Sequence, residues 1–376
     1  MPLASWLLVL LGFALLIAAA DLVVRGASSL ARAAGVAPLV VGLTVVAFGT
    51  SAPEVAVSIK AALAGQEGLA LGNVVGSNVF NVLLVLGISA LIVPLSVQPQ
   101  LVRFDVPVLI AVSALPLLMA LDGVLARWEG VVLIALAVVY TTVLIFTGRR
   151  PRDAMREAAT DSREASSASA GLARNVARVV VGCVGLVLGA DLLVKGATDI
   201  ARTLGVSNVV IGITLVAAGT SLPELATSVV ASLRGERDLA VGNVVGSNIF
   251  NTLVVLGAAA TVASGGMDIP RGVLTFDLPV MLAVAVTCLL FFFSDWTVSR
   301  AEGMVFLAYY ALFILYLTLD ASDHEARNLA RSAVLSLVPM ATLLGLLSWW
   351  NGRSDTRPPP PPPPDPAPSG AGDLPR

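Results

Sequence analysis

Charged residues are scarce in this chain of 376 residues. Asp, Glu, Lys and Arg together make up 13% of it, about half their share in ordinary soluble domains. In contrast, 57% of the residues are apolar and the mean hydropathy is +0.89. With about 20 residues per crossing, the apolar stretches suffice for about ten or eleven membrane spans. We therefore predict an all-α integral membrane protein, and exclude soluble domains, a single-span receptor and a peripheral protein.

Several motifs that mark other protein classes are also missing. Outside the loops there is no block of Lys and Arg, and no phosphate-binding GxxxxGKS or GxxxxGKT loop occurs, so nucleic acid is not expected as a ligand. Cys183 and Cys288 each stand alone in an apolar run, which indicates packing rather than a disulfide framework or a CxxC metal site. The single histidine, His324, lies in a polar loop. The first apolar run lacks a basic region and a clear cleavage site, so we interpret it as a span rather than a signal peptide.

Ten apolar segments fall into two sets of five. Their approximate bounds are 3–24, 36–64, 69–94, 104–121 and 128–147, then 174–201, 206–233, 239–264, 273–293 and 299–319. The charged, Ser- and Ala-rich segment between the sets has the composition of a flexible loop. We predict a first five-helix repeat (1–147), a cytoplasmic loop (148–172), a second five-helix repeat (173–320), a polar linker with one extra transmembrane helix (321–350), and a disordered Pro-rich tail (351–376).

The two sets are copies of one another. Residues 42–87 and 212–257 align without gaps at an offset of 170, with about 29 of 46 positions identical. Because five spans is an odd number, the second copy must enter the membrane with the opposite orientation. Inverted repeats of this kind are typical of secondary transporters, whose binding sites form near the midplane where the halves meet.

The distribution of basic residues predicts the orientation in the cell (inner) membrane. Cytoplasmic loops carry an excess of Lys and Arg. One side would hold Arg149, Arg150, Arg152, Arg156 and Arg163 of the central loop with Arg25, Arg32, Arg103, Arg234, Arg237 and Arg300, and the other Lys60, Arg127, Lys195, Arg202 and Arg271. This bias favours an external N-terminus and a cytoplasmic central loop.

Each repeat places one carboxylate deep in an apolar segment, at Glu54 in GTSAPE and Glu224 in GTSLPE. Ionisable residues inside a membrane are costly and usually functional. The preceding prolines, Pro53 and Pro223, should break or kink the helix and leave carbonyl oxygens free. Neighbouring hydroxyls complete a local cluster of oxygen atoms: Thr50, Ser51, Thr220 and Ser221.

A second motif, GNVVGSNVFN and GNVVGSNIFN, adds further oxygen atoms. Ser77 and Asn81, four residues apart, share a helix face, as do Ser247 and Asn251. Ligands of oxygen alone, without His or Cys, favour hard cations such as Ca²⁺ or Na⁺. The alternative is that these small polar residues only hold helices together, with the glutamates protonated. The occurrence of both glutamates in inverted copies favours ion binding.

The paired GTSxPE and GNVVGSNxFN blocks resemble the α-repeats of the sodium/calcium exchanger family, within the cation/calcium antiporters, over residues 1 to about 320. The resemblance implies ten core helices, a central four-site cluster, and alternating access by sliding of the first helix of each half. It implies ion ligands from the side chains of Glu54, Glu224, Ser51, Ser221, Ser77, Ser247, Asn81 and Asn251, and from the main-chain carbonyls of Ala47, Thr50, Ala217 and Thr220.

Two departures bear on the transported ions. Some members, including the potassium-dependent branch, carry Asp where this chain has Asn251, which speaks against potassium co-transport. The proton/calcium branch has GNxxE, whereas Gly76 and Gly246 take the Glu position here. Exchange of Na⁺ for Ca²⁺ without a cofactor is therefore the favoured function, and a proton-coupled antiporter is the alternative.

Two other classes of protein stay open. An intramembrane hydrolase could use the two carboxylates as an acid and a base, and a passive channel could conduct the ions. Acid/base catalysis needs two different pKa values, whereas the contexts of the two glutamates are nearly identical, which speaks against an enzyme. Elsewhere we expect ion pairs of Asp21 with Arg25 and of Asp191 with Lys195, and helix N-caps at Asp105 and Asp277.

Overall fold

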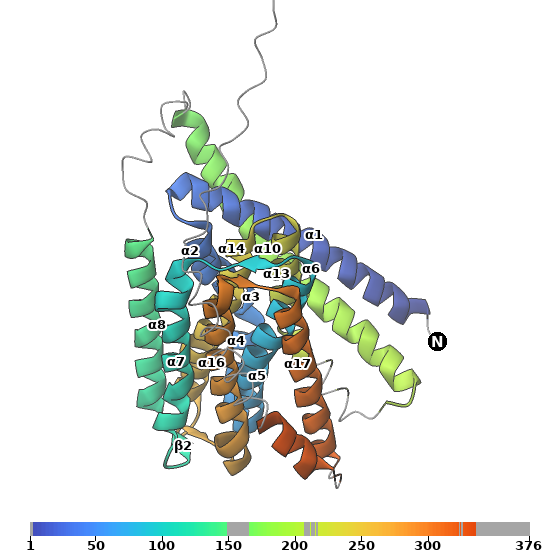
Figure 1. The fold of residues 1–376 in the computed structure, drawn as a ribbon. Helices are drawn as coiled ribbons and strands as arrows, with labels where there is room; N and C mark the ends of the chain where they lie inside the picture. The colour runs from blue at the N-terminus through green and yellow to red at the C-terminus, as the bar shows by residue number, and fades with distance from the viewer. Residues whose placement is uncertain are drawn as a thin grey trace, which may run out of the picture.

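The computed structural model describes residues 3–148, 165–206, 211, 215, 217–322, 324 and 326–335. Eight helices within these ranges are long and apolar enough to cross a membrane. The helices Pro38–Thr50 and Ala52–Leu63, which meet at an angle of 46°, pass the same test as a pair and would make a ninth if they form one span. The helices stand side by side as a bundle, with two long helices packed obliquely against it (Figure 1).

From α3 in the first half and α12 in the second, the described elements follow the same order. The first half contains α1 (Leu3–Ala34), α2 (Pro38–Val41), η1 (Gly42–Val46), α3 (Ala47–Thr50), α4 (Ala52–Leu63), α5 (Glu67–Phe80), η2 (Asn81–Leu86), α6 (Gly87–Ile92), β1 (Leu95–Ser96), η3 (Leu101–Asp105), α7 (Val106–Met119), β2 (Val124–Leu125) and α8 (Arg127–Thr147), where η denotes a π-helical turn. The second contains α10 (Ala165–Thr203), α12 (Ala217–Gly219), α13 (Leu222–Leu233), α14 (Arg237–Phe250), η5 (Asn251–Leu256), α15 (Gly257–Val262), β3 (Met267–Asp268), η6 (Val273–Asp277), α16 (Leu278–Asp295), β4 (Thr297–Val298) and α17 (Arg300–Ala321).

The first helices of the two halves, α1 and α10, show that the repeats are inverted. A Cβ atom on Gly12 would lie 2.5 Å from the backbone nitrogen of Leu193, and one on Gly196 would lie 2.6 Å from the carbonyl oxygen of Ser5. The start of α1 therefore lies against the end of α10, and the two equivalent helices run antiparallel, side by side (Figure 1). Glycines at the contact permit this close approach of two helix backbones.

Each repeat is also completed by elements of the other. Strand β1 pairs with β4, where Leu95 lies opposite Val298, and β2 pairs with β3. Helix α8 packs on α15, and α17 packs on α6. At the contact between α8 and α15, a Cβ atom on Gly130 would lie 2.6 Å from the carbonyl oxygen of Gly257. The largest cluster of buried apolar residues draws on both halves, so the two repeats share one core.

The helix break predicted at the prolines is present. Helix α3 ends at Thr50 and α4 begins at Ala52, with Pro53 in its first turn. Proline has no N–H to donate and its ring clashes with the preceding turn, so the chain bends here. Helix α13 begins in the same way at Leu222, with Pro223 in its first turn.

These observations confirm the predicted all-α membrane fold with a core of two inverted five-helix repeats. One boundary differs, because α10 begins at Ala165, inside the predicted loop 148–172. Alanine is the strongest helix former, and this stretch contains several. Residues 327–335 are helical, whereas the rest of the predicted eleventh span and the Pro-rich tail lie outside the described residues.

Candidate cation-binding site

Two buried glutamates face the centre of the bundle. Glu54 lies in the first turn of α4 and Glu224 in the first turn of α13, and both are 0% exposed. The helices that carry them lie in the interior of the bundle (Figure 1). In each glutamate the Oε2 atom has no hydrogen-bond partner within the described part of the chain.

Serines join the two glutamates across the repeats. The Ser51 hydroxyl donates to Glu224 Oε1 at 3.0 Å, and the Ser221 hydroxyl donates to Glu54 Oε1 at 2.9 Å. The sequence predicts each serine in a cluster with the glutamate of its own motif. The structure instead pairs each with the glutamate of the other repeat, so the two half-sites form a single cluster.

The second motif contributes its serines to the same cluster. Ser77 on α5 lies 3.4 Å from Glu54 Oε1, and its hydroxyl oxygen lies 2.9 Å from the hydroxyl oxygen of Ser221. Ser247 on α14 lies 3.5 Å from the hydroxyl oxygen of Thr50. The predicted serines and Thr50 therefore converge, as expected from the sequence.

The predicted asparagines occupy an unusual backbone position. Asn81 and Asn251 are the first residues of the π-helical turns η2 and η5, and both side chains are fully buried. Neither the oxygen nor the nitrogen of either amide has a partner among the residues the structure describes. Buried side-chain amides are normally hydrogen-bonded, and π-helical turns often mark functional sites. Their oxygens, together with the Oε2 atoms of the glutamates, are acceptors suited to a cation.

Among the main-chain carbonyls predicted as ligands, that of Ala47 can keep a lone pair free. The carbonyl oxygen of Ala47 accepts from the Ser51 N–H at 3.0 Å and lies 3.3 Å from the Thr50 hydroxyl. That hydroxyl can instead donate to Val46 O at 3.1 Å, which would leave a lone pair of Ala47 O free. In the second half, Ala217 begins α12, and the Thr220 hydroxyl donates to Asn73 Oδ1 at 3.2 Å.

Two serines that the sequence analysis did not single out position the glutamate-bearing helices. Asn73 Nδ2 donates to Ser58 Oγ at 2.9 Å and lies 3.3 Å from the Glu54 carbonyl oxygen. In the second repeat, Asn243 Nδ2 donates to Ser228 Oγ at 3.0 Å. These bonds fix α5 to α4 and α14 to α13. The sequence does contain a pattern that indicates these two serines, because in both repeats a serine follows the glutamate by four residues.

The middle asparagines of the second motif hold helices together instead. Asn78 Nδ2 lies 3.0 Å from Thr252 Oγ1 and 3.2 Å from Met281 Sδ. Asn248 Nδ2 donates to the carbonyl oxygen of Asn78 at 3.2 Å. For these two residues the packing interpretation fits the contacts better than ion binding.

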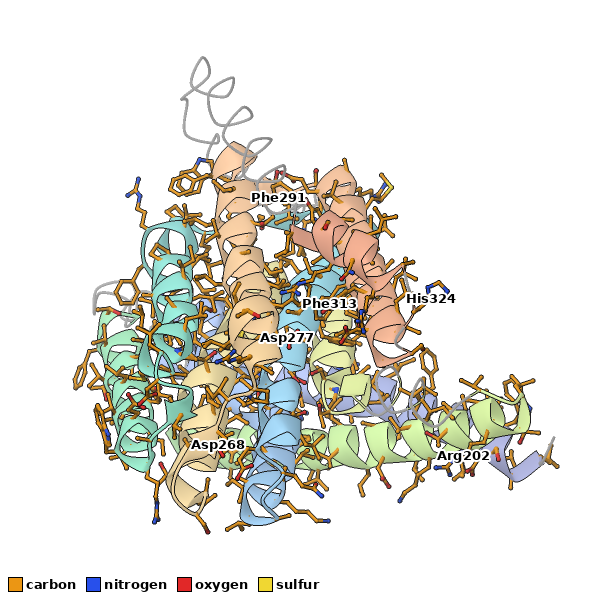
Figure 2. All side chains as sticks on the ribbon, turned by 90° about the horizontal axis from the view of Figure 1, so that it is seen from below. Arg202, Asp268, Asp277, Phe291, Phe313 and His324 are labelled. Atoms are coloured by element: carbon orange, nitrogen blue, oxygen red, sulfur yellow. The ribbon has the colours of Figure 1, made fainter. Side chains whose placement is uncertain are left out.

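The helix N-cap predicted at Asp105 is wrong. Asp105 has a helical backbone at the end of η3 and makes no capping bond, because an N-cap residue needs a non-helical conformation. Its buried carboxylate accepts from Tyr140 at 3.1 Å and from Gln100 at 3.2 Å. Asp277 likewise has a helical backbone and no side-chain cap; Figure 2 shows its place at the start of α16.

The two predicted ion pairs lie at partly exposed positions. The predicted pairs are present, with 2.8 Å between Asp21 and Arg25 and 2.6 Å between Asp191 and Lys195. His324 projects from the edge of the molecule (Figure 2). No group of three or more His, Cys, Asp or Glu side chains gathers anywhere in the described ranges. A cation in the central cluster would therefore have two carboxylates and otherwise neutral oxygens as ligands.

Comparison with known proteins agrees with the architecture. The family model described as sodium/calcium exchanger protein matches residues 4–146 and 175–319. The chain is 39% identical over 321 residues to the putative antiporter CaxA of Alkalimonas amylolytica, covering 83% of this chain and 99% of that one. It is 34% identical over 349 residues to the sodium/calcium exchanger MaX1 of Methanosarcina acetivorans, covering 83% and 98%. A solved structure of the sodium-calcium exchanger NCX_Mj superimposes with a TM-score of 0.72 at 31% identity, covering 84% and 99%.

Proposed function

Because the chain belongs to the sodium/calcium exchanger family, we propose that it exchanges Na⁺ for Ca²⁺ by alternating access at the central cluster. Family membership makes the chain a cation/Ca²⁺ antiporter of a multi-pass membrane type. The identity of the coupling ion and the residues that bind the ions are our proposals. They rest on one observation, the joining of Glu54 and Glu224 into a single buried oxygen cluster by serines of the opposite repeat.

Ca²⁺ would lie between the two glutamates. Two carboxylates neutralise one divalent ion, and Ca²⁺ takes six to eight oxygen ligands at about 2.3–2.6 Å. The oxygens of Ser51, Ser221, Ser77, Ser247, Asn81 and Asn251, and the carbonyls of Ala47, Thr50, Ala217 and Thr220, would supply the remaining ligands for Ca²⁺ and for Na⁺.

Competition for the same oxygens provides the coupling. When Na⁺ ions occupy the sites beside the glutamates, they neutralise the carboxylates. Ca²⁺ is then released, because Na⁺ and Ca²⁺ cannot both bind to the same oxygens at full strength. The movement that closes the site requires either bound Ca²⁺ or the full number of bound Na⁺ ions. Each ion therefore shifts the population between the inward-open and outward-open states by its difference in affinity for the two. No covalent chemistry takes part.

At one of the two positions where the proton/calcium branch carries glutamate, the packing of α14 favours Na⁺ over H⁺ as the coupling ion. The proton/calcium branch carries a glutamate at the position of Gly246. A Cβ atom there would lie 2.6 Å from the carbonyl oxygen of Leu43 and 2.7 Å from its Cα. The close contact of α14 with η1 leaves no room for a glutamate side chain at this position.

The two glutamates also have equivalent surroundings, which argues against an intramembrane hydrolase. Each follows a proline in the first turn of a helix, is fully buried, and accepts from the serine of the other repeat. An acid/base pair needs environments that separate the two pKa values. The relatives are named as antiporters and exchangers rather than as enzymes.

Transport in sealed vesicles tests the proposal. Vesicles loaded with Na⁺ and diluted into Na⁺-free medium that contains labelled Ca²⁺ should take up Ca²⁺ against its gradient. A passive channel would only equilibrate it. Uptake driven equally well by a pH gradient in the absence of Na⁺ would contradict sodium coupling. Labelling of single cysteines introduced into the N-terminal region and the central loop tests the proposed orientation, with the N-terminus outside and the loop in the cytoplasm.

A further inference from the structure

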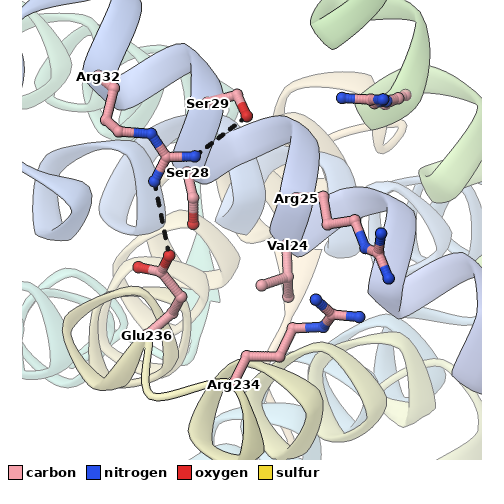
Figure 3. Close-up of a pocket in the computed structure, with 8 residues that line it drawn as sticks. Val24, Arg25, Ser28, Ser29, Arg32, Arg234 and Glu236 are labelled. Atoms are coloured by element: carbon pink, nitrogen blue, oxygen red, sulfur yellow. Dashed lines mark hydrogen bonds and ion pairs between the residues drawn. The ribbon is translucent and has the colours of Figure 1, made fainter. Parts of the chain in front are cut away.

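Four arginines line a cavity that is separate from the glutamate cluster. The cavity has a volume of about 290 Å³ and lies between α1, α10 and the turn that joins α13 to α14. Arg25 and Arg32 come from α1, Arg178 from α10 and Arg234 from the turn, and none of the predicted ion ligands lines it. Figure 3 shows the arginines of α1 and of the turn around it, with Glu236 opposite Arg32.

The charges around this arginine cavity do not balance. Asp21 pairs with both Arg25, at 2.8 Å, and Arg234. Glu236 lies 3.9 Å from Arg32. Among the described residues, the four guanidiniums therefore meet two carboxylates, which leaves a net charge of +2 (four minus two). A phosphate monoester carries a charge of about −1.5 to −2 at pH 7, and so would neutralise this excess.

The cavity also offers a buried polar group. Ser28 lines it and is 3% exposed, and the hydroxyl has no hydrogen-bond partner within the described ranges. Because buried hydroxyls are normally hydrogen-bonded, this one indicates a ligand with acceptor oxygens. Arg178 donates to the neutral side chain of Asn175 at 3.1 Å, so its charge also remains available.

The inverted repeat supplies an internal comparison. At the offset of 170, the positions of Arg178 and Arg234 correspond to Leu8 and Ala64 in the first half. Two of the four guanidiniums therefore have no counterpart at the opposite end of the molecule. The positive-inside rule explains an excess of Lys and Arg on one side, but it does not explain why arginines from three elements meet around one cavity with an unpartnered serine.

We propose that the arginine cavity binds a phosphate group, presented by an anionic lipid headgroup or by a soluble phosphate compound. Guanidiniums form paired, charge-assisted hydrogen bonds with phosphate oxygens, and basic pockets at the cytoplasmic ends of transmembrane helices suit headgroups. Because the lining comes from α1, α10 and the α13–α14 turn, the bound phosphate would join the first helix of each repeat to the rest of the bundle.

Calorimetric titration of the purified full chain, without Na⁺ or Ca²⁺, tests this site. The probes are dihexanoyl phosphatidic acid and inorganic pyrophosphate, with dihexanoyl phosphatidylcholine as the zwitterionic reference. We expect saturable binding of phosphatidic acid, pyrophosphate or both, and a Kd at least about ten-fold higher in the double variant Arg32→Gln/Arg178→Gln. Ser28→Ala should raise the Kd by a smaller factor, and it keeps the test valid if the double variant does not fold.

Arg174→Gln is the matched control, because it removes one charge from an exposed position of α10, one turn from Arg178 and outside the cavity. Its Kd should stay within about two-fold of the original. Binding of phosphatidic acid alone would assign the site to lipid, and binding of pyrophosphate alone would assign it to a soluble phosphate. The proposal fails if neither probe binds saturably, if the double variant and Ser28→Ala bind like the original chain, or if Arg174→Gln weakens binding as much as the double variant.

Discussion

Ser221 donates a 2.9 Å hydrogen bond to Glu54, although 167 residues separate them and each repeat has a serine and a glutamate of its own. The reciprocal bond from Ser51 to Glu224 makes the arrangement nearly two-fold symmetric. Neither repeat can therefore form the proposed site alone, and a shift of one half relative to the other would change the hydrogen bonds of both glutamates at once. This relationship is what a transporter with one central site between two moving halves requires.

Neutralising either glutamate should abolish Ca²⁺ transport. Glu54→Gln or Glu224→Gln keeps the shape of the side chain but removes one of the two charges that balance Ca²⁺, so we expect its Kd to rise by about 100-fold or more. Labelled Ca²⁺ uptake into vesicles and calorimetry measure the two effects. Glu67→Gln, in the first turn of α5, is the control and should transport normally. Unchanged flux in either site variant would rule out the proposed ligands.

A double-mutant cycle should detect the cross-repeat bond. For Ser221→Ala with Glu54→Gln, the coupling in free energy of unfolding should be roughly 1–3 kcal/mol, because a hydrogen bond to a buried charge is lost. For Ser51→Ala with Glu54→Gln it should be below about 0.5 kcal/mol. Thr287→Val, which removes a hydroxyl that donates to Ala283 O in α16, serves as the control. Larger coupling within a motif than across the repeats would contradict the arrangement.

Ca²⁺ and Na⁺ should each stabilise the purified protein, and their effects should not add. Ca²⁺ at about 100 times its Kd should raise the free energy of unfolding by about 2.7 kcal/mol. Removing it with a chelator should reverse the change. With Na⁺ already saturating, the same Ca²⁺ concentration should give a smaller increase, because both ions use the same oxygens. Fully additive stabilisation, measured by thermal unfolding, would show separate sites and would end the competition model.

Gly246→Ala should destabilise the protein through the contact between α14 and η1. The added Cβ atom would lie 2.6 Å from Leu43 O, and overpacking of this kind costs about 1–3 kcal/mol. Denaturant unfolding in detergent measures the loss. Gly272→Ala, where no described atom lies within 4 Å of the new Cβ, is the control and should be neutral or slightly stabilising. A Gly246→Ala protein as stable as the original would disprove the tight contact.

Breaking the ion pair between Asp21 and Arg234 should affect the rate of transport more than Ca²⁺ binding. The pair links α1 to the α13–α14 turn, and its side chains are 25% and 36% exposed, so its contribution is about 0.2–1 kcal/mol and is screened by salt. Arg234→Gln should therefore speed Na⁺-driven Ca²⁺ uptake by up to about five-fold at low salt. Lys195→Gln, which breaks a pair within α10 alone, is the control. An unchanged rate for Arg234→Gln at every salt concentration would show that the pair does not hold α1.

The sequence by itself determined the membrane class, the ten core spans and the inversion. Apolar length sets the number of crossings, and a five-span repeat can return only upside down. It also indicated the proposed site, because a glutamate after a helix-breaking proline is conspicuous in an apolar segment. These features are local, or depend on counting along the chain, and so need no knowledge of which helices touch.

Only the tertiary structure decided which side chains form hydrogen bonds with one another. Whether Ser221 serves Glu224 or Glu54 depends on how two helix breaks face each other across the bundle, and no spacing within one motif records that. The π-helical turns that begin at Asn81 and Asn251 were likewise not predicted from the sequence. Asp105 shows the same limit, because the sequence fits a helix cap, yet a tyrosine on α8 binds its carboxylate. Contacts between distant segments are set by the packing of the whole bundle, and local sequence rules do not reach them.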